Sequence, residues 1–383
     1  MLSSVFAKNT RKNTDGRITN VICNSAKQGL IPQREYFDKD IANSNNTSGY
    51  YIIEENDFVY NPRKSSDAPY GPISSYKYSE AGIVSPLYLC FRAKIEINPA
   101  FFEWYFRSSA WHRYVYMSGD SGARHDRVSI KDDTFFAMPI NIPSTHEQAQ
   151  IASFLERIEQ RIEMQRALVD NLKKYKRGLL RDVFSRLSVS CDMRSLKDVS
   201  ILFADGDWIE SKDQASEGIR LVQTGNVGFG VYLDKPQNAK YISEATFRRL
   251  NCLEVYGGDI LISRLPEPAG RACLLPETKE RRITAVDCTV IRTDASVMDK
   301  NYLLQFLCSE QYLITVNSFL AGGTRQRISR KNLEGIEMPY PSINLQRHYG
   351  DFLSKVDARI LNAEHRLNCL NRLRCFMLQQ LFI

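Results

Sequence analysis

The sequence predicts a mixed α/β (α+β) fold: two similar globular domains separated by two long helices that pair as an antiparallel coiled coil. Three observations predict this class: an internal repeat, two apolar stripes with coiled-coil spacing, and short β-like runs between turn signals. The chain has 383 residues, enough for two or more domains. Its hydrophobic content of 43% supports packed cores, and its charged content of 25% is ordinary for a folded protein.

The second half of the chain repeats the landmarks of the first half. The matching segments are SGARHDRVSIKDDTFFAMP (121–139) with GGTRQRISRKNLEGIEMP (322–339), and LKKYKRGLLRDVF (172–184) with LNRLRCFMLQQLF (370–382). The offset drifts from 201 at Arg124 and Arg325 to 198 at Phe184 and Phe382. Small drifts with preserved order indicate two diverged copies of one unit, and two similar halves suggest a target that also has two halves.

The first globular domain is predicted over residues 1–143. YYIIEENDFVYN (50–61) is typical of two short strands around a polar turn, and IVSPLYLCFRAKI (83–95) of one strand. PAFFEWYFRSSAWHRYVY (99–116) has helix-like aromatic spacing, and we expect its tryptophans to be core residues rather than base-stacking platforms. The two prolines of MPINIP (138–143) then end any regular element.

A long helix is predicted over 144–187. Ser144 and Glu147 have the spacing of a capping box directly after Pro143. Apolar residues then recur at steps of four and three, and this period of 3.5 is typical of a coiled coil. A helix of about 35 residues would be about 50 Å long. The stripe consists of Ile151, Leu155, Ile158, Ile162, Gln165, Val169, Leu172, Lys176, Leu179 and Val183.

The second domain is predicted over 188–341, and the second long helix over 342–383. Strands are expected in 221–232, 256–264 and 284–294, and a helix in 301–320. The second stripe consists of Tyr349, Leu353, Val356, Ile360, Ala363, Leu367, Leu370, Arg374, Met377 and Leu381. Its one basic position, Arg374, corresponds to Lys176 in the first stripe. Pairing the two stripes with each other would bury both; the alternative is that each helix packs on its own domain. The period of 3.5 favours the antiparallel pair.

Composition and motifs limit the chemistry. A net charge of +7 is compatible with a nucleic-acid partner but does not require one. The nine cysteines include no C-x-x-C pair, so we expect neither a disulfide framework nor a zinc site, and a reducing cytoplasm fits best. Residues after Met1 lack a signal-peptide core, and no apolar run has the length of a membrane span. The sequence contains no G-x-x-x-x-G-K-[ST] phosphate-binding loop, so we do not expect this chain to bind ATP.

The order of domain, helix, domain, helix resembles the specificity (S) subunit of Type I restriction-modification enzymes. EQAQIASFLERIEQRIEMQ (147–165) and LKKYKRGLLRDVF (172–184) resemble the conserved helical region of that family. PYPSINLQRHYGDFLSKVDARI (339–360) matches the same pattern less closely. The segments 56–74 and 121–133 resemble one branch of the family's target recognition domains. The resemblance covers essentially the whole chain.

This resemblance implies a non-catalytic DNA-recognition subunit. Each globular domain would read one half of a bipartite double-stranded DNA site, and the helices would set the spacing between the half-sites. The helices would also dock two modification (methyltransferase) subunits and, through them, the restriction (translocase and nuclease) subunits. S-adenosylmethionine, ATP and Mg are expected in those partner subunits, with no cofactor or metal in this chain and no membrane partner.

Candidate DNA contacts lie in two glycine-containing loops that each carry two arginines. Arginine can bind guanine bidentately and glutamine can bind adenine, whereas contact with phosphate or a surface acid is the alternative for each. The basic face at Lys173, Lys174, Lys176 and Arg177 is either a solvated face or a further DNA contact. The candidate DNA-binding residues are Arg63, Lys64, Ser65, Arg124, His125, Arg127, Lys131, Arg264, Arg325, Gln326, Arg327, Arg330 and Lys331.

Two other function classes stay open. A coiled-coil scaffold that never touches nucleic acid would share the helices but not the role of the arginine loops. A stand-alone nuclease or methyltransferase would need catalytic motifs. Glu277 and Lys279, with Asp259 upstream, have the spacing of a nuclease metal site, although such triplets often arise by chance. Asn61-Pro62 continues as Arg-Lys and so lacks the motif of amino-methyltransferases.

Overall fold

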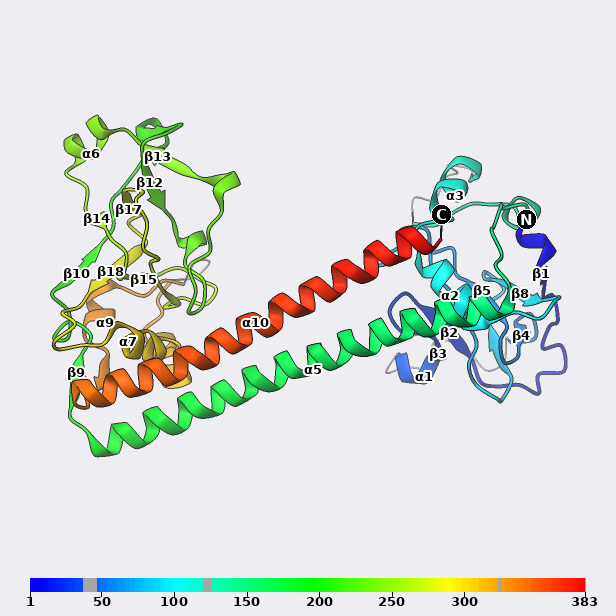
Figure 1. Ribbon diagram of the computed structural model, residues 1–383, viewed down its shortest axis with the longest axis horizontal. Helices are drawn as coiled ribbons and strands as arrows, with labels where there is room; N and C mark the ends of the chain where they lie inside the picture. Colours follow the sequence, from blue (N-terminus) through cyan, green and yellow to red (C-terminus); the bar gives the residue numbers. More distant parts are fainter. Residues whose placement is uncertain (37–46, 120–125, 323–325, 383) are drawn as a thin grey trace. The chain divides into compact units, whose positions relative to one another are not determined.

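The computed structural model describes residues 1–36, 47–119, 126–322 and 326–382 (Figure 1). It divides into two compact units: Met1–Gln165 with Arg366–Ile383, and Arg166–His365. Each unit contains one α/β domain and the adjoining portions of two long helices. The mixed α+β fold with two long paired helices is therefore confirmed.

The domain of the first unit is built on a four-stranded antiparallel sheet in the order β1-β8-β5-β6. Its strands are β1 (Phe6–Lys8), β8 (Leu89–Ala93), β5 (Phe58–Tyr60) and β6 (Ile73–Ser75). Two antiparallel pairs adjoin it: β2 (Ile22–Ser25) with β3 (Gly29–Pro32), and β4 (Tyr51–Ile53) with β7 (Gly82–Val84). The helices are η1 (Leu2–Ser4), α1 (Gln33–Tyr36), α2 (Pro99–Arg107), α3 (His112–Ser118) and α4 (Asp132–Phe136).

Aromatic side chains fill the core of this unit. Phe6 lies edge-on to Phe58, Phe91 and Phe102, with ring centroids 5.0 to 5.3 Å apart. Such edge-to-face pairs stabilise a core beyond the area that they bury. Trp104 and Trp111 are buried in the same cluster, as the sequence predicted.

The domain of the second unit contains a four-stranded sheet and a five-stranded sheet. The first has the order β10-β18-β15-β16, from β10 (Leu202–Asp205), β18 (Cys288–Arg292), β15 (Ile260–Ser263) and β16 (Ala272–Leu274). The second has the order β11-β13-β12-β17-β14, from β11 (Gln214–Ala215), β13 (Lys240–Ile242), β12 (Ile219–Val222), β17 (Arg282–Thr284) and β14 (Glu254–Val255). β9 (Met193–Ser195) pairs with β19 (Glu337–Pro339). The helices are η3 (Ser211–Asp213), η4 (Thr224–Asn226), η5 (Pro236–Asn238), α6 (Glu244–Leu250), α7 (Lys300–Leu307), α8 (Glu310–Ser318) and α9 (Arg330–Glu334).

The internal repeat is visible in matching contacts. The four-stranded sheets of the two units place corresponding strands in the same order. In the first unit, Asp57 receives hydrogen bonds from Arg92 Nε (2.6 Å) and Arg92 Nη2 (2.7 Å). In the second unit, Asp259 receives the same pair from Arg292 Nε (2.8 Å) and Nη2 (2.7 Å). Each bidentate pair fixes the start of the strand that leads into a candidate recognition loop.

Two predicted helices are divided in the structure. The segment 301–320 forms α7 and α8, because the Ser309 hydroxyl accepts a hydrogen bond from the Tyr312 N–H (3.2 Å) and so caps a new helix. The segment 99–116 forms α2 and α3, with extended backbone at Ser108 between them. A serine side chain can hydrogen-bond to nearby backbone groups, which favours a helix end over a helix interior. The spacing of apolar residues alone does not reveal such a break.

The long helices are α5 (Thr145–Ser190, 46 residues) and α10 (Ile343–Leu381, 39 residues). The predicted capping box starts α5: the Ser144 N–H donates to Glu147 Oε2 (2.9 Å), and the Glu147 N–H donates to Ser144 Oγ (3.3 Å). None of the helices in the described ranges has an apolar stretch of the length and hydropathy needed to cross a membrane.

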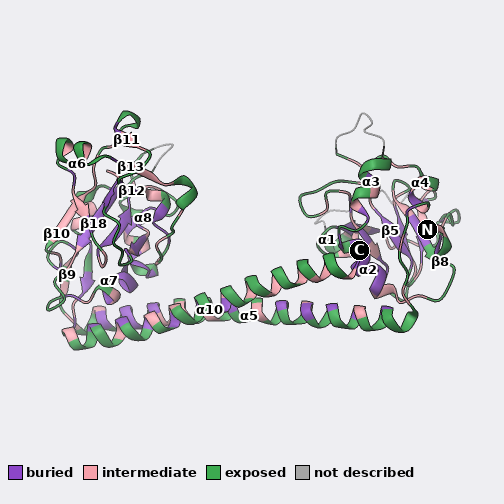
Figure 2. Ribbon diagram, turned by 45° about the horizontal axis from the view of Figure 1, so that its top comes forward, coloured by how far each residue is buried: buried purple, intermediate pink, exposed green. Residues whose placement is uncertain are grey.

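In the first unit, the start of α5 and the end of α10 belong to one core cluster; in the second, the end of α5 and the start of α10 do so. The pair is therefore antiparallel, and Figure 2 shows the buried residues of α5 along one face. The residues predicted for the interface are all buried or half-buried, namely Ile151, Leu155, Ile158, Ile162, Val169, Leu172, Leu179, Leu353, Val356, Ile360, Leu367, Leu370 and Met377.

The basic positions of the two stripes are neutralised across the pair. Lys176 Nζ contacts Asp357 Oδ1 in the second unit, and Arg374 Nη1 lies 2.8 Å from Glu159 Oε2 in the first. Asp357 follows Glu159 by 198 positions, the same offset that relates Arg374 to Lys176. The repeat therefore reproduces an ion pair as well as an apolar stripe.

A buried glutamine attaches each domain to its long helix. The Asn98 N–H donates to Gln148 Oε1 (2.9 Å), and Gln148 Nε2 donates to the Pro143 carbonyl (3.0 Å). In the second unit, Gln346 Oε1 accepts from the Asp299 N–H (3.0 Å), and its Nε2 donates to the Pro341 carbonyl (2.9 Å). Asn98 and Asp299 are the N-caps of α2 and α7, so each glutamine joins a domain helix to the start of a long helix.

Candidate nucleic-acid interface

In the first unit, two loops that are far apart in the sequence pair with each other. Arg63 and Arg127 form an antiparallel bridge. The Lys64 N–H donates to the Asp126 carbonyl (2.8 Å), and the Val128 N–H donates to the Pro62 carbonyl (2.8 Å). The backbone thereby places the candidate residues of the loop after β5 beside the candidate arginine of the second loop.

These paired loops border a cavity of about 900 Å³. Its wall carries the cations of Lys27, Arg63, Lys64 and Arg127, together with Asn24 and Asn61, whose side chains are hydrogen-bonded within the unit. The lining contains one carboxylate, that of Asp67, which lies 3.6 Å from Lys27 Nζ. A concave wall rich in donors and cations suits phosphate oxygens and base edges.

Arg127 is a weakly compensated cation of this wall. Its side chain is 31% exposed, and its Nε is buried without a hydrogen-bond partner among the described residues. Its nearest acid is the neighbouring Asp126, at 3.9 Å. Burial raises the pKa of the nearby Tyr88 hydroxyl, so that this side chain stays a neutral donor at physiological pH. Arg127 is therefore placed to donate a hydrogen bond to an external acceptor.

The remaining candidates of the first unit have less structural context. Ser65 is exposed, and its hydroxyl accepts from the Ala68 N–H (3.1 Å) within its own turn. Lys131 is exposed at the N-cap of α4. Arg124 and His125 lie outside the described residues.

In the second unit, the corresponding loops also meet. The Ile328 N–H donates to the Arg264 carbonyl (3.3 Å), which joins the loop after β15 to the segment that precedes α9. Gln326 is exposed and borders a cavity of about 500 Å³ beside Pro266 and Asn317. Arg327, the next residue in the chain, is also exposed, and Arg325 lies outside the described residues.

Arg264, which was predicted as a DNA contact, is instead buried within the second unit. Its side chain is 5% exposed, its Nη2 donates to the Val286 carbonyl (2.6 Å), and it lies 3.3 Å from Asp205 Oδ2. Burial lowers the pKa of this guanidinium. Because these groups hold it inside the domain, Arg264 supports the loop rather than contacting DNA. Its neighbours come from β10 and from the turn before β18, which local sequence does not reveal.

Arg330 and Lys331 start α9 and are exposed. Arg330 Nε lies 3.3 Å from Glu334 Oε1, one turn along the same helix. Such an exposed pair is weak and leaves the arginine able to exchange partners. Both residues can contact phosphate without rearrangement of the backbone.

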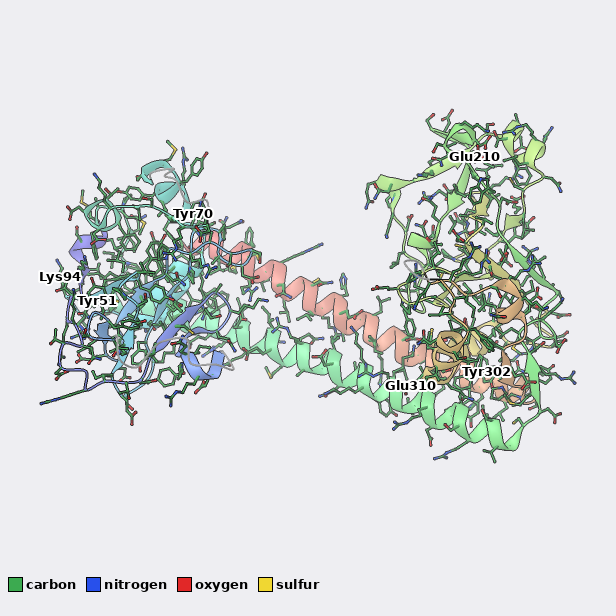
Figure 3. The ribbon with its side chains drawn as sticks, turned by 180° about the vertical axis from the view of Figure 1, so that it is seen from behind. Tyr51, Tyr70, Lys94, Glu210, Tyr302 and Glu310 are labelled. Carbon is green, nitrogen blue, oxygen red and sulfur yellow. The ribbon has the colours of Figure 1, made fainter. Side chains whose placement is uncertain are left out.

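The basic face of α5 is partly neutralised within the helix pair. Lys173 lies 2.7 Å from Glu364 Oε1, and Lys176 contacts Asp357. Lys174 and Arg177 are exposed and line a cavity of about 970 Å³. Glu310, which is labelled in Figure 3, lines the same cavity. Half of the predicted basic face therefore serves helix pairing.

The nuclease alternative gains no support from the geometry. Asp259 is buried, and both of its carboxylate oxygens are engaged by Arg292. No group of three metal-ligating side chains occurs among the described residues. Asp205 and Asp287, which lie beside Arg264 and Arg327, are not predicted from sequence, and neither are the roles of the two buried glutamines. A useful signal for the glutamines was their equal place in both copies, three to five residues into a long helix.

Comparison with known proteins gives a family match over both halves. The sequence model described as "Type I restriction modification DNA specificity domain" matches residues 7–174 and 189–372. The Type I restriction enzyme MjaVIII specificity subunit from Methanocaldococcus jannaschii is 21% identical over 241 residues. That alignment covers 58% of this chain and 56% of the relative, so the match spans little more than half of the relative's length.

Solved structures show the same fold. A chain from a study of complex assembly and conformational transition in a type I R-M system has a TM-score of 0.64 and 18% identity, covering 99% of this chain and 95% of that chain. The HsdS subunit from Thermoanaerobacter tengcongensis has a TM-score of 0.55 and 17% identity, over 100% and 95%. The S subunit of a Type-I restriction-modification system from M. genitalium has a TM-score of 0.55 and 14% identity, over 100% and 95%.

Proposed function

Because this chain belongs to the family of Type I restriction modification DNA specificity domains, of which it carries two copies, we propose that it is the DNA-reading subunit of a type I restriction-modification complex. Each domain reads one half of a bipartite double-stranded site. The observation that carries this proposal is the repetition of the same unit: the same sheet order, the same pinned strand start and the same loop pair that presents an arginine.

The exposed cations divide into two roles. Lys64, Lys131, Arg330 and Lys331 contact phosphates, which fixes the register of the protein on the duplex without reading sequence. Arg127 and Gln326 border concave surfaces beside the paired loops, where a base edge can enter, and Arg327 is exposed next to Gln326. Arginine reads guanine and glutamine reads adenine through two hydrogen bonds each. The different side chains at corresponding positions would give the two half-sites different sequences.

The helix pair sets the distance between the half-sites. α5 has 46 residues, so it is about 70 Å long. Its apolar stripe and the two matched ion pairs with α10 fix the register of the pair. A pair with fixed register holds the two readers at a constant spacing.

The outer faces of the same helices dock two copies of one modification subunit. Phe154 and Phe352 are large, substantially exposed apolar side chains, and they are related by the repeat offset of 198. Tyr175 and Leu373 form a second exposed pair with the same offset. Exposed apolar groups on a folded protein mark interaction surfaces, and their repetition matches a partner present in two copies. Restriction subunits would join through these modification subunits.

In this proposal, the chain supplies no catalytic group. S-adenosylmethionine, ATP and Mg bind the partner subunits, which carry out methylation, translocation and cleavage. The complex works in the cytoplasm, where its DNA target lies. The support within the chain is the engagement of Asp259 by Arg292 at the one nuclease-like triplet.

Methylation mapping tests the proposed function. The chain would be produced with a type I modification subunit from the same host and incubated with S-adenosylmethionine and genomic DNA. The modified bases would then be mapped by sequencing. We expect methylated adenines in two short sequences separated by a constant gap. Binding that is equal on all duplexes, with no bipartite methylation pattern, would contradict the proposal and favour a scaffold without DNA recognition.

A further inference from the structure

Four charged side chains form an arginine–aspartate cluster beneath the recognition edge of the second unit. The cluster consists of Asp205, Arg264, Asp287 and Arg327. Arg264 Nη2 lies 3.3 Å from Asp205 Oδ2, and Arg327 Nη2 lies 3.1 Å from Asp287 Oδ1. Two cations and two anions give the cluster no net formal charge. Its members come from β10, the loop after β15, the turn before β18 and the segment before α9.

The inner half of the cluster is a support. Arg264 is buried, and its backbone is hydrogen-bonded to the segments that carry two other members of the cluster. The Arg264 N–H donates to the Asp287 carbonyl (2.9 Å). The Arg264 carbonyl in turn accepts from the Ile328 N–H (3.3 Å), next to Arg327. The Thr289 hydroxyl donates to Asp205 Oδ1 (2.8 Å) and fixes the remaining carboxylate. The base beneath Arg327 is therefore rigid.

In the outer half of the cluster, Arg327 contacts Asp287 on one side and solvent on the other. The Arg327 side chain is 45% exposed, whereas Asp287 Oδ1 is buried and has no aligned hydrogen bond within the described part of the chain. A guanidinium carries five N–H donors in a planar fork, so one carboxylate leaves donors free for an external acceptor. Holding a long side chain in place beforehand reduces the entropy lost when it binds.

Given the proposed function, on which this inference rests, we propose that Asp287 is a positioning residue that orients Arg327 to read one guanine in the half-site of the second domain. Asp287 holds Arg327 from behind while the free edge of the guanidinium meets guanine O6 and N7. Arg264 and Asp205 keep Asp287 and the backbone beside Arg327 in place. Arg327 touches DNA; the other three residues act through it.

The first unit lacks this support, which makes the inference specific to the second domain. The Arg92–Asp57 and Arg292–Asp259 pairs align β8 with β18 and place Leu87 where the second unit has Asp287. The Val128–Pro62 and Ile328–Arg264 backbone bonds likewise place Pro62 at the position of Arg264. Arg127 therefore faces its cavity without an acid at the position that Asp287 occupies in the second unit, and the two domains present their arginines in different ways.

The proposed role of Asp287 and simple electrostatics predict opposite changes in the affinity for the specific site when this carboxylate is removed. A carboxylate near DNA repels phosphates, so its removal alone should tighten binding to every sequence. If Asp287 orients a guanine reader, Asp287→Asn should instead weaken binding to the specific site while leaving non-specific affinity unchanged or tighter. The two effects have opposite directions and can be measured on the same preparation.

The test uses the complex of the chain with its modification subunit and a fluorescent duplex carrying the mapped site. Dissociation constants are measured for this duplex, for single-base-pair variants of the second half-site and for a random duplex. We expect Asp287→Asn to lose about 5- to 150-fold of the discrimination at one G·C pair, the range of one bidentate arginine–guanine contact. Glu337→Gln is the matched control, because it removes one exposed negative charge from the same unit outside the cluster.

Arg327→Lys provides a second variant that keeps the charge but cannot form the planar fork. It should lose discrimination at the same base pair as Asp287→Asn, and the double variant should lose little more than either single one. Discrimination retained at every position by Asp287→Asn, or a uniform loss across all duplexes for Arg327→Lys, would overturn the inference. A wild-type complex with no bipartite preference would instead overturn the proposed function.

Discussion

At the scale of single residues, the two basic side chains within the apolar stripes are placed where a carboxylate neutralises them. Lys176 and Arg374 occupy stripe positions that would otherwise be apolar, and each meets a carboxylate from the opposite helix. Partly buried charges of this kind cost stability when either partner is lost. The repeat of both pairs at one offset indicates that they set the alignment of the helices as well as their stability.

Asp357→Ala should lower the free energy of unfolding of the second unit by about 1–2 kcal/mol, because it leaves Lys176 unpaired and removes the acceptor of the Gln305 amide (2.7 Å). Thermal unfolding followed by circular dichroism measures the change. Asp351→Ala, at an exposed position on the same helix, serves as the control. An effect of Asp357→Ala no larger than that of the control would show that the pair contributes nothing to stability.

His112 should make the free energy of unfolding of the first unit depend on pH. Burial lowers the pKa of this imidazole, which packs against the rings of Tyr70 and Trp111. The unfolded chain therefore binds a proton more readily than the folded one, so stability is complete above about pH 6.5 and falls as the pH drops below that value. His112→Gln should flatten the unfolding free energy between about pH 7 and pH 5. An unchanged pH slope would exclude His112 as its source.

At the scale of elements, local pattern predicted the long helices better than the domains. The period of 3.5 predicts the buried face of α5 and α10 directly, since a helix keeps its spacing wherever it lies. The division of 301–320 depends on one side-chain cap at Ser309, and the meeting of the loops around Arg63 and Arg127 depends on long-range strand pairing. The burial of Arg264 has the same origin, because Asp205 approaches it from β10 and Val286 from the turn before β18.

The two buried glutamines should stabilise the junction between each domain and its long helix. Gln148→Leu should lower the free energy of unfolding of the first unit by about 1–3 kcal/mol, since it leaves the Asn98 N–H and the Pro143 carbonyl without their partner. Hydrogen exchange should also speed up at the start of α2. Gln346→Leu should act in the same way on α7, and Gln160→Leu, at an exposed position of α5, should do neither. Protection of α2 that is unchanged by Gln148→Leu would contradict this role.

At the scale of the whole molecule, the chain repeats a unit made of a domain and a helix. The helices have kept the same stripe and the same ion pairs, whereas the recognition edges have diverged to an open cavity in one unit and an arginine–aspartate cluster in the other. A shared frame with different readers is what an asymmetric bipartite site requires. The sequence predicted the repeat but could not predict this difference, which depends on Leu87 and Asp287 at matching places.

Helix length should control the gap between the half-sites. Inserting seven residues at facing positions of both α5 and α10 keeps the apolar stripes in phase and lengthens each helix by about 10 Å, equivalent to about three base pairs. The mapped gap should grow by that amount while both half-site sequences stay the same. A change in the half-site sequences at a constant gap would contradict the role of the helices as a spacer.

The most direct test of the central claim compares two single variants in the intact complex. Arg127→Ala alters the first domain and Arg327→Ala the second, and methylation mapping reports both halves of the site at once. The account predicts that Arg127→Ala relaxes one half-site, that Arg327→Ala relaxes the other, and that the gap is unchanged in both. Relaxation of the same half-site by both variants, or a uniform loss of methylation with no relaxed position, would contradict the claim that each domain reads its own half.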